Sequence, residues 1–226
     1  MTTMLNIQAV LFDLDGTLVD SAPDLGAAVD QMRTARGLPS LPPSAYRQAA
    51  SAGARGLLAA AFDMQPDDAD YAAYSEEFLS NYAQRLLRQT VLFAGVADLL
   101  QALQQRGLPW GIVTNKAARF AEPIARGLDD LRHAAVLISG DTLPQAKPHP
   151  APLLEAARRM AVAPRHCLYV GDDLRDIQAA HAAGMVGMAA LWGYLGGVDV
   201  ATWGADAQVQ QPAEVLAWLD QQTRRA

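Results

Sequence analysis

Two aspartates, separated by one leucine, stand where the first apolar run of the chain ends. The stretch Asp13-Leu14-Asp15-Gly16-Thr17 directly follows Ala9–Phe12, an apolar run that we predict to be a buried strand. Carboxylates at the end of a buried strand can bind a cation or transfer protons to and from a substrate. Because Gly16 tolerates the backbone conformations of a tight turn, the chain can turn there and leave both carboxylates at the strand end.

Polar segments also follow three later apolar runs. Thr114-Asn115-Lys116 follows Trp110–Val113, a loop reaching Lys147-Pro148 follows Ala135–Ile138, and Gly171-Asp172-Asp173-Leu174-Arg175-Asp176 follows Leu168–Val170. Taken alone, each segment has a structural explanation as a turn, a helix cap or a solvated loop. Ligands of open α/β sheets bind at the carboxyl ends of the strands, so four such segments in one sheet favour a functional site.

The acidic residues of these segments predict a magnesium site. Several carboxylates at one sheet edge repel one another unless a cation joins them, and oxygen ligands suit Mg²⁺ rather than a soft metal. We therefore expect Asp13 and Asp172 to hold a divalent ion, with room left for a substrate phosphate. The four histidines show no spacing typical of a zinc site: His133, His149, His166 and His181.

The elements that position these residues alternate between strands and helices. Apolar, β-branched runs predict strands at Ala9–Phe12, Trp110–Val113, Ala135–Ile138, Leu168–Val170 and Val186–Leu191. Helical periodicity lies between most of them, at Val96–Arg106, Ala151–Met160 and Asp173–Ala183, with Gly or Pro at the helix ends. This alternation predicts an α/β fold in which helices cover both faces of a parallel sheet, giving three layers.

Residues 20–88 interrupt this alternation with helical patterns and no convincing strand. Ser21 with Asp24 has the spacing of a capping box, which would begin a helix that runs through Arg36 and ends at Gly37. Further helices are expected at Ala45–Ala50, Arg55–Phe62 and Asp68–Leu87. We predict a helical module at residues 20–88 inserted into an α/β core domain formed by residues 1–19 and 89–226.

Composition narrows the possible partners. The chain has 226 residues, 51% of them hydrophobic, and a net charge of -6, which disfavours nonspecific binding to nucleic acid or anionic lipid. The single cysteine, Cys167, cannot form an internal disulfide and lies in an apolar run, so we expect a buried thiol in a reducing compartment. With no targeting or membrane-spanning segment recognised, we expect a cytoplasmic protein, and any phosphate that it handles is expected to belong to a small molecule. The sequence does not indicate the oligomeric state.

In these motifs the sequence resembles the haloacid dehalogenase superfamily. The family's four motifs match Asp13-Leu14-Asp15-Gly16-Thr17, Thr114-Asn115, Lys147-Pro148 and Gly171-Asp172-Asp173-Leu174-Arg175-Asp176, in the expected order along nearly the full chain. The resemblance implies a Rossmann-like three-layer core, and it identifies the helical insertion as a C1-type cap domain. It also implies a phosphatase that works through an aspartyl-phosphate intermediate.

The resemblance assigns a role to each motif residue. Asp13 would be the nucleophile, Asp15 the general acid and base, and Thr114 and Lys147 would stabilise the phosphoryl oxygens. Asp13, Asp15 and Asp172 form the implied Mg²⁺ site, and Asn115 joins Thr114 and Lys147 in substrate binding. The negative charge nearby is expected to favour a proton on Asp15. Asp173 and Asp176 would lie further from the metal or orient Lys147.

Within the superfamily, the pattern is closest to the phosphoglycolate phosphatase group, which includes relatives acting on N-acetylmuramic acid 6-phosphate. Segments such as Asp20-Ser21 and Trp192-Gly193-Tyr194 carry this likeness, and Arg119-Phe120-Ala121-Glu122-Pro123-Ile124 resembles the muramate-phosphate subgroup. Both substrates carry a carboxylate, which Arg55, in the cap, could bind; the alternative is that Arg55 is solvated.

The same fold and motifs also occur in proteins with other functions. A β-phosphoglucomutase-like enzyme would use the same motifs but return the phosphoryl group to a sugar instead of releasing phosphate. Superfamily members that displace halide lack the second aspartate, so Asp15 argues against dehalogenation. A non-catalytic protein of this fold would lack at least one motif residue, whereas this chain has all of them.

Overall fold

A parallel sheet of six strands, in the order β5-β4-β1-β6-β7-β8, forms the centre of the molecule. The structure is a computed structural model, which describes residues 6–224. The strands are β1 (Ala9–Phe12), β4 (Trp110–Val113), β5 (Leu137–Ile138), β6 (Cys167–Gly171), β7 (Val186–Ala190) and β8 (Ala207–Val209). Every neighbouring pair is parallel, which confirms the predicted α/β class.

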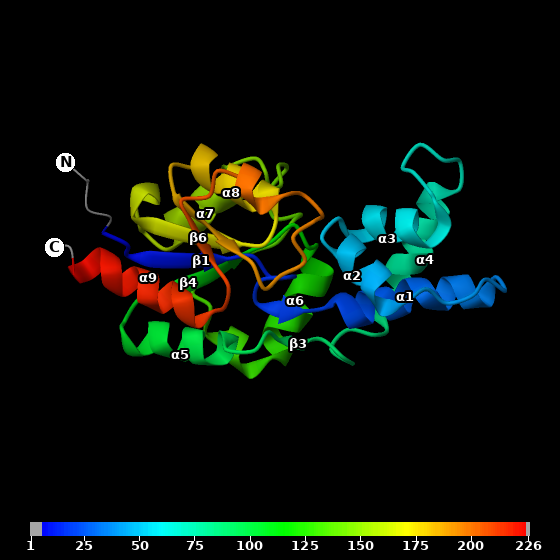
Figure 1. The fold of residues 1–226 in the computed structure, drawn as a ribbon, viewed down its shortest axis with the longest axis horizontal. Helices are drawn as coiled ribbons and strands as arrows, with labels where there is room; N and C mark the ends of the chain where they lie inside the picture. Colours follow the sequence, from blue (N-terminus) through cyan, green and yellow to red (C-terminus); the bar gives the residue numbers. More distant parts are fainter. Residues whose placement is uncertain (1–5, 225–226) are drawn as a thin grey trace.

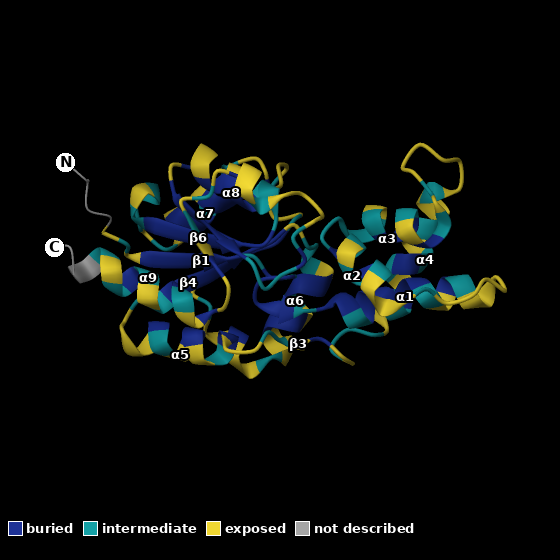
Figure 2. Cartoon of the chain, in the orientation of Figure 1, coloured by how far each residue is buried: buried dark blue, intermediate teal, exposed yellow. Residues whose placement is uncertain are grey.

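Helices cover both faces of this sheet, as Figure 1 shows. On one face lie α5 (Val96–Gln105), α6 (Ala118–Gly127) and α9 (Ala213–Arg224), and on the other α7 (Ala151–Arg159) and α8 (Leu174–Ala182). Alternate residues of β1 serve the two faces, because Val10 and Phe12 pack in the first layer while Ala9 and Leu11 pack in the second. The sheet between them is buried throughout β1, β4, β6 and β7 (Figure 2).

The buried sheet accounts for the single cysteine. Cys167 begins β6 and is fully buried, and its burial raises the pKa of the thiol to about 11. The residue therefore contributes to packing, as the sequence predicted. Three short 3-10 helices complete the connections of the core: Asp129–His133, Pro164–His166 and Val200–Thr202.

Four helices of the insertion stand to one side of the core in Figure 1. They are α1 (Ala22–Ala35), α2 (Pro43–Ala50), α3 (Gly53–Phe62) and α4 (Tyr71–Ala83). Their apolar faces form a cluster of their own around Met32, Leu57 and Phe78, to which Phe120 and Tyr194 of the core also belong. The boundaries at residues 20 and 88 stay a prediction, and residues 1–5 and 225–226 of the proposed core domain lie outside the described residues.

Two short strands close the base of the insertion. β2 (Val19–Asp20) pairs antiparallel with β3 (Val91–Leu92), so the segments that enter and leave the helices run side by side. Antiparallel pairing of these segments sets the position of the helices relative to the end of β1.

The predicted capping box at the start of α1 is wrong. Ser21 is the N-cap residue but makes no side-chain cap hydrogen bond; its hydroxyl donates to Asp15 instead. The main-chain N–H groups of Ser21 and Ala22 donate to the hydroxyl of Tyr194, at 2.9 and 3.0 Å. The hydroxyl of Tyr194, in the loop after β7, thus caps the N-terminus of α1 in place of the side chain of Ser21.

Asp24, the other half of the expected box, also binds outside its own helix. Its carboxylate accepts hydrogen bonds from the main-chain N–H of Gln89 and from both the N–H and the hydroxyl of Thr90, at 2.8–2.9 Å. Asp24 is fully buried. It ties α1 to the chain that returns to the core.

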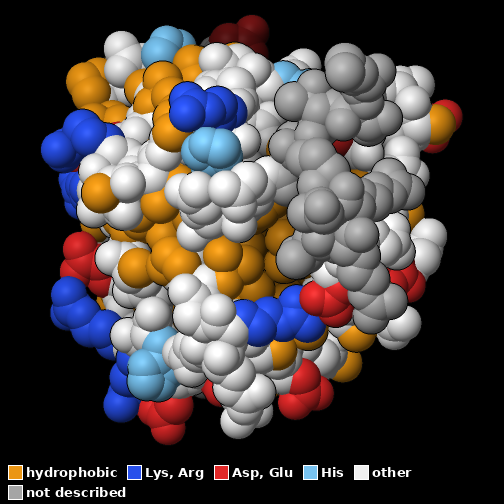
Figure 3. Space-filling view, turned by 90° about the vertical axis from the view of Figure 1, so that its left-hand side faces the viewer, with side chains coloured by type: hydrophobic (Ala, Val, Ile, Leu, Met, Phe, Trp, Pro, Cys, Tyr) orange, Lys and Arg blue, Asp and Glu red, His pale blue; other side chains and the backbone are white. Residues whose placement is uncertain are grey.

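The opposite end of the molecule, which faces the viewer in Figure 3, carries apolar side chains in its middle with charged side chains mostly around them. Among the helices within residues 6–224, none combines the length and the hydropathy needed to cross a bilayer.

Candidate active site

The carboxyl ends of β1, β4 and β6 meet at the insertion and open into one cavity. β1 lies between β4 and β6, at the point where the strand order reverses, which is where open α/β sheets bind ligands. The cavity has a volume of about 390 Å³. The core lines it with the motif residues, and the insertion adds Leu25, Phe78, Tyr82 and the run Ser51–Ala54.

The turn after β1 is built around Gly16. This residue has φ +86°, and a Cβ placed on it would lie 2.1 Å from a carboxylate oxygen of Asp172. Asp172 is held there by the Thr17 hydroxyl at 2.9 Å and by the main-chain N–H of Tyr194 at 2.8 Å. The predicted turn is confirmed, and glycine is required there both for the backbone conformation and for the approach of Asp172.

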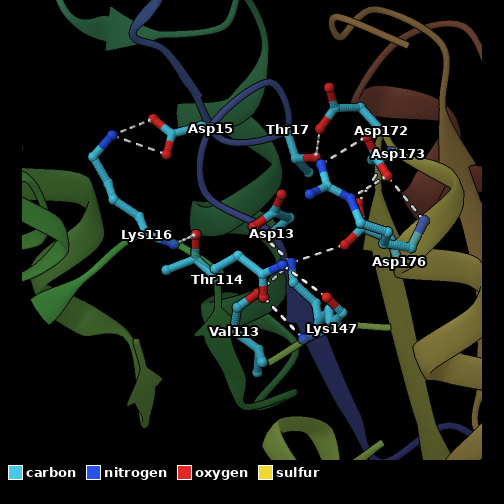
Figure 4. A network of polar contacts seen from close by, with 12 residues as sticks. Asp13, Asp15, Thr17, Val113, Thr114, Lys116, Lys147, Asp172, Asp173 and Asp176 are labelled. Carbon is cyan, nitrogen blue, oxygen red and sulfur yellow. Dashed lines mark hydrogen bonds and ion pairs between the residues drawn. The ribbon is translucent and has the colours of Figure 1, made fainter. Parts of the chain in front are cut away.

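Lys147 is buried beside Asp13 (Figure 4). Its ammonium lies 2.9 Å from Asp13 and donates to Asp176 at 2.8 Å, to the Tyr169 hydroxyl at 2.8 Å and to the Val113 carbonyl at 3.0 Å. Burial acts to lower the pKa of Lys147, but the charges of Asp13 and Asp176 outweigh it and raise the pKa above its usual range. The lysine is therefore a fixed positive charge next to the Asp13 carboxylate.

Asn115 and Thr114 follow β4, and their side chains serve different purposes. The Asn115 amide donates to the Lys147 carbonyl and accepts from the Lys147 N–H, both at 2.9 Å. It therefore positions the main chain of Lys147, in addition to lining the cavity. The buried Thr114 hydroxyl accepts from the Lys116 N–H at 3.1 Å and keeps its own proton to donate.

Three carboxylates are close enough to share a cation. Asp13, Asp172 and Asp176 each offer an oxygen, and these atoms lie within 4.8 Å of one another. Burial, together with the charges of Asp13 and Asp176, raises the pKa of Asp172 well above its usual range. Since one lysine cannot neutralise three carboxylates, and all-oxygen donors suit Mg²⁺, the residues present fit a divalent ion.

The side chain of Asp15 does not join this carboxylate cluster, and its place in the metal site stays a prediction. Both of its carboxylate oxygens accept hydrogen bonds from the Lys116 ammonium at 3.0 Å, and one also accepts from the Ser21 hydroxyl. Its nearest charged partner is thus a cation and not the like charge expected from the sequence. In Figure 4 this pair lies apart from Asp13 and Asp172. Lys116 stood in the second motif segment, but the sequence could not reveal its partner.

Asp173 and Arg175 connect the core to the insertion. The Asp173 carboxylate caps α8 through the Arg175 N–H at 2.9 Å and pairs with the Arg175 guanidinium at 2.8 Å. Arg175 also donates to the carbonyl of Ser51 at 2.7 Å, and the Ser51 hydroxyl donates to Asp173. These contacts hold the Ser51–Ala54 run against the cavity, a role that the sequence did not indicate.

Arg55 is not brought into the cavity. The preceding run Ser51–Ala54 lines it, whereas Arg55 is exposed and is not among the lining residues. The first turn of α3 presents its small residues to the site and leaves Arg55 in solvent. The carboxylate-binding role expected for Arg55 is therefore not supported, and the alternative, a solvated arginine, describes its position.

Comparison with known proteins matches this arrangement to a family. The family model described as haloacid dehalogenase-like hydrolase matches residues 7–184. The chain belongs to this family of hydrolases. A phosphoglycolate phosphatase of Xanthomonas campestris pv. campestris (strain 8004) is 52% identical over 215 residues, which cover 93% of this chain and 97% of the relative. The resemblance seen in the motifs is thereby confirmed.

Two further relatives support the same activity. The N-acetylmuramic acid 6-phosphate phosphatase of Pseudomonas aeruginosa PAO1 is 41% identical over 217 residues, covering 96% of each chain. A crystal structure of a predicted phosphoglycolate phosphatase from Haemophilus somnus 129PT superimposes with a TM-score of 0.84 at 28% identity, covering 95% of this chain and 98% of that chain. This hydrolase is a phosphatase, a phosphoric monoester hydrolase of the haloacid dehalogenase type.

Proposed function

We propose that this phosphatase is a Mg²⁺-dependent enzyme that forms an aspartyl phosphate on Asp13 and acts on a small phosphorylated carboxylic acid, with phosphoglycolate as the first candidate. The observation that carries the proposal is the position of Asp13. Its carboxylate lies 2.9 Å from the Lys147 ammonium and belongs to the same cluster of carboxylates as Asp172, and both residues line the cavity. A carboxylate held in this way can act as a nucleophile toward phosphorus.

In the first step, a carboxylate oxygen of Asp13 attacks phosphorus and the bond between phosphorus and the leaving oxygen breaks. Asp15 donates a proton to that oxygen, which leaves as an alcohol. The Lys147 ammonium and the Thr114 hydroxyl stabilise the charge on the remaining phosphoryl oxygens. Both oxygens of Asp15 accept hydrogen bonds from the Lys116 ammonium in this structure, which holds the side chain of Asp15 at the cavity.

In the second step, Asp15 takes a proton from water as the water oxygen attacks phosphorus. The bond between phosphorus and Asp13 breaks, and inorganic phosphate and the free Asp13 carboxylate are released. The bound form of Asp15 seen here, a carboxylate accepting hydrogen bonds from Lys116, is suited to accepting that proton.

Asp13 and Asp172 would hold the Mg²⁺ ion, and Asp176 lies close enough to contribute. When bound, the ion supplies Lewis-acid stabilisation of phosphoryl charge and allows an anionic substrate to approach the anionic nucleophile. Asp176 already binds Lys147 and the Asp173 N–H, so its main task is to position Lys147.

The size of the cavity keeps N-acetylmuramic acid 6-phosphate as a second candidate. A volume of about 390 Å³ falls in the range of pockets that enclose larger ligands, roughly 300–1,000 Å³, and exceeds the needs of a two-carbon acid. Apolar side chains, including Phe78, Leu79 and Phe120, line part of it. A sugar with acetyl and lactyl methyl groups would contact these side chains, whereas phosphoglycolate would leave them exposed to water.

Phosphate release measured with Mg²⁺ tests the proposal. Phosphoglycolate, N-acetylmuramic acid 6-phosphate and β-glucose 1-phosphate are compared, with the Asp13→Asn variant as the blank. The proposal expects release from at least one carboxylated substrate that exceeds the release from the sugar phosphate and is lost in the variant. Equal or greater turnover of β-glucose 1-phosphate would rule out the proposed substrate class, and a need for a sugar bisphosphate primer would indicate a mutase.

A further inference from the structure

Four cationic side chains line the cavity, and three of them are already paired with carboxylates. Lys147 lies between Asp13 and Asp176, Arg175 pairs with Asp173, and Lys116 binds Asp15. The pairs of Lys147 and Lys116 involve the proposed catalytic aspartates, and the pair of Arg175 with Asp173 contacts Ser51 of the insertion. Within residues 6–224, the remaining lining cation, Arg119, has no ion-pair partner.

Arg119 lies in the first turn of α6, three positions after Lys116 in the sequence. Its guanidinium carbon lies 4.7 Å from the centre of the Phe120 ring. Stacking of this kind restrains a guanidinium while leaving the N–H groups at its edge free to donate. An arginine held against an aromatic ring and facing a cavity without a carboxylate of its own is ready to bind an anion from a ligand.

Arg119 lies on a different side of the cavity from the residues that would bind the phosphate. Asp13, Lys147 and Asp172 occupy the phosphoryl side of the cavity. Lys116 binds Asp15, the residue proposed to protonate the leaving oxygen, so the segment from Lys116 to Arg119 borders the leaving-group side. Arg119 is exposed to solvent, and the buried, apolar ring of Phe120 lies beside its guanidinium.

We infer that Arg119 binds the carboxylate of the substrate's leaving group and thereby selects phosphorylated acids over uncharged phosphate esters. This inference rests on the proposed function. A planar guanidinium matches a carboxylate with two parallel hydrogen bonds, whereas an uncharged leaving group would leave its donors unpaired in the cavity. Arg119 takes the role that the sequence offered to Arg55: both arginines are exposed, but only Arg119 lines the cavity.

The test compares variants by a ratio of specificity constants. Phosphoglycolate, N-acetylmuramic acid 6-phosphate and p-nitrophenyl phosphate are assayed with Mg²⁺ using wild type, Arg119→Gln, Arg119→Lys and the matched control Arg55→Gln. We expect Arg119→Gln to lower the ratio of kcat/KM for the carboxylated substrate to that for p-nitrophenyl phosphate by about 10- to 100-fold, mainly through KM. Arg119→Lys recovers part of this ratio, and Arg55→Gln leaves it at the wild-type value.

The outcomes separate this inference from the function on which it depends. A wild type that cleaves p-nitrophenyl phosphate but neither carboxylated substrate would overturn the proposed function, and the inference with it. If the wild type prefers a carboxylated substrate and Arg119→Gln keeps the same ratio, the proposed function stands and the inference fails. An equal loss on all three substrates would also overturn the inference, because it would show a general role for Arg119 and no selection by charge.

Discussion

Lys116 binds Asp15 through both carboxylate oxygens, each 3.0 Å from the ammonium nitrogen. The lysine side chain is largely buried and lies 4.6 Å from the centre of the Tyr82 ring, so a residue of the insertion covers the pair. Burial acts to lower the pKa of Lys116, yet the charge of Asp15 outweighs it and raises the pKa above the usual range. Lys116 is therefore a positioning residue for Asp15 that remains charged.

Replacing Lys116 with methionine is expected to lower kcat by about 10- to 100-fold, with a smaller change in KM. The reason is that Asp15 loses the partner that holds it at the edge of the cavity, and a displaced acid–base group transfers protons less efficiently. Steady-state kinetics on the preferred substrate measure the effect, and Lys116→Arg, which keeps the positive charge, should retain more of kcat. A methionine variant with wild-type kcat would contradict this role.

Gly16→Ala is expected to reduce activity by about 100-fold and to weaken Mg²⁺ binding. The new Cβ would lie 2.1 Å from an Asp172 oxygen, so the carboxylate must move out of its position among the metal-binding group. Gly107→Ala is the matched control, because Gly107 also has a positive φ, +64°, but an added Cβ meets nothing within 4 Å. Gly107→Ala should lose about 1 kcal/mol of stability and Gly16→Ala at least as much, whereas only Gly16→Ala should lose activity and metal affinity by calorimetry.

Lys147→Met is expected to lower the free energy of unfolding by about 3–5 kcal/mol, because it leaves Asp13 and Asp176 buried without their cation. The pKa of Lys147 is raised in the folded protein, so its stabilisation is complete below the ordinary value of 10.5 and is lost as pH rises above it. Urea unfolding of both proteins at pH 8 and pH 11 measures this difference. A gap between the two proteins that widens at the higher pH would contradict the assignment.

Asp24→Ala is expected to destabilise the protein by about 2 kcal/mol. The change removes the acceptor for Thr90 and Gln89 and leaves main-chain donors unpaired near the return to the core. Asp67→Ala, at an exposed aspartate of the insertion, should change stability by less than about 0.5 kcal/mol. Equal unfolding midpoints for the two variants would show that the hydrogen bonds from Gln89 and Thr90 to Asp24 do not stabilise the protein.

The residues at the strand ends could be predicted from the sequence because each motif is local. Ala9–Phe12 and Trp110–Val113 are strands with the predicted bounds, and the motif residues that follow them line one cavity. A parallel sheet brings the ends of its strands to one edge, so the grouping of distant segments followed from fold class alone. Their individual partners did not follow from it.

Predictions from the sequence failed where a side chain could bind either a neighbouring residue or one that is distant in the sequence, and bound the distant one. Ser21 and Asp24 have the spacing of a capping box, yet the hydroxyl of Tyr194 supplies the cap, and Asp24 binds the chain at Gln89 and Thr90. Nothing in the local sequence records these distant partners. Arg55 and Arg119 differ in the same way, because only the packing of α3 and α6 decides which arginine lines the cavity.

Short or weakly marked elements also escaped sequence analysis. β2 and β3 contain two residues each, which is too short for an alternating pattern to appear. α6 begins after Ala117 without a side-chain cap and contains Pro123, so it lacks the usual signals of a helix. Both kinds of element form because tertiary packing stabilises them.

The central claim is that Asp13 becomes phosphorylated during turnover. Acid quenching of the enzyme in the steady state with Mg²⁺ and its preferred substrate, followed by peptide mass spectrometry, tests this most directly. We predict one added phosphoryl group on the peptide that contains Asp13, sensitive to mild base as an acyl phosphate is, and absent from Asp13→Asn. Phosphate release at the wild-type rate by Asp13→Asn, or a phosphoryl group on another residue, would contradict the account.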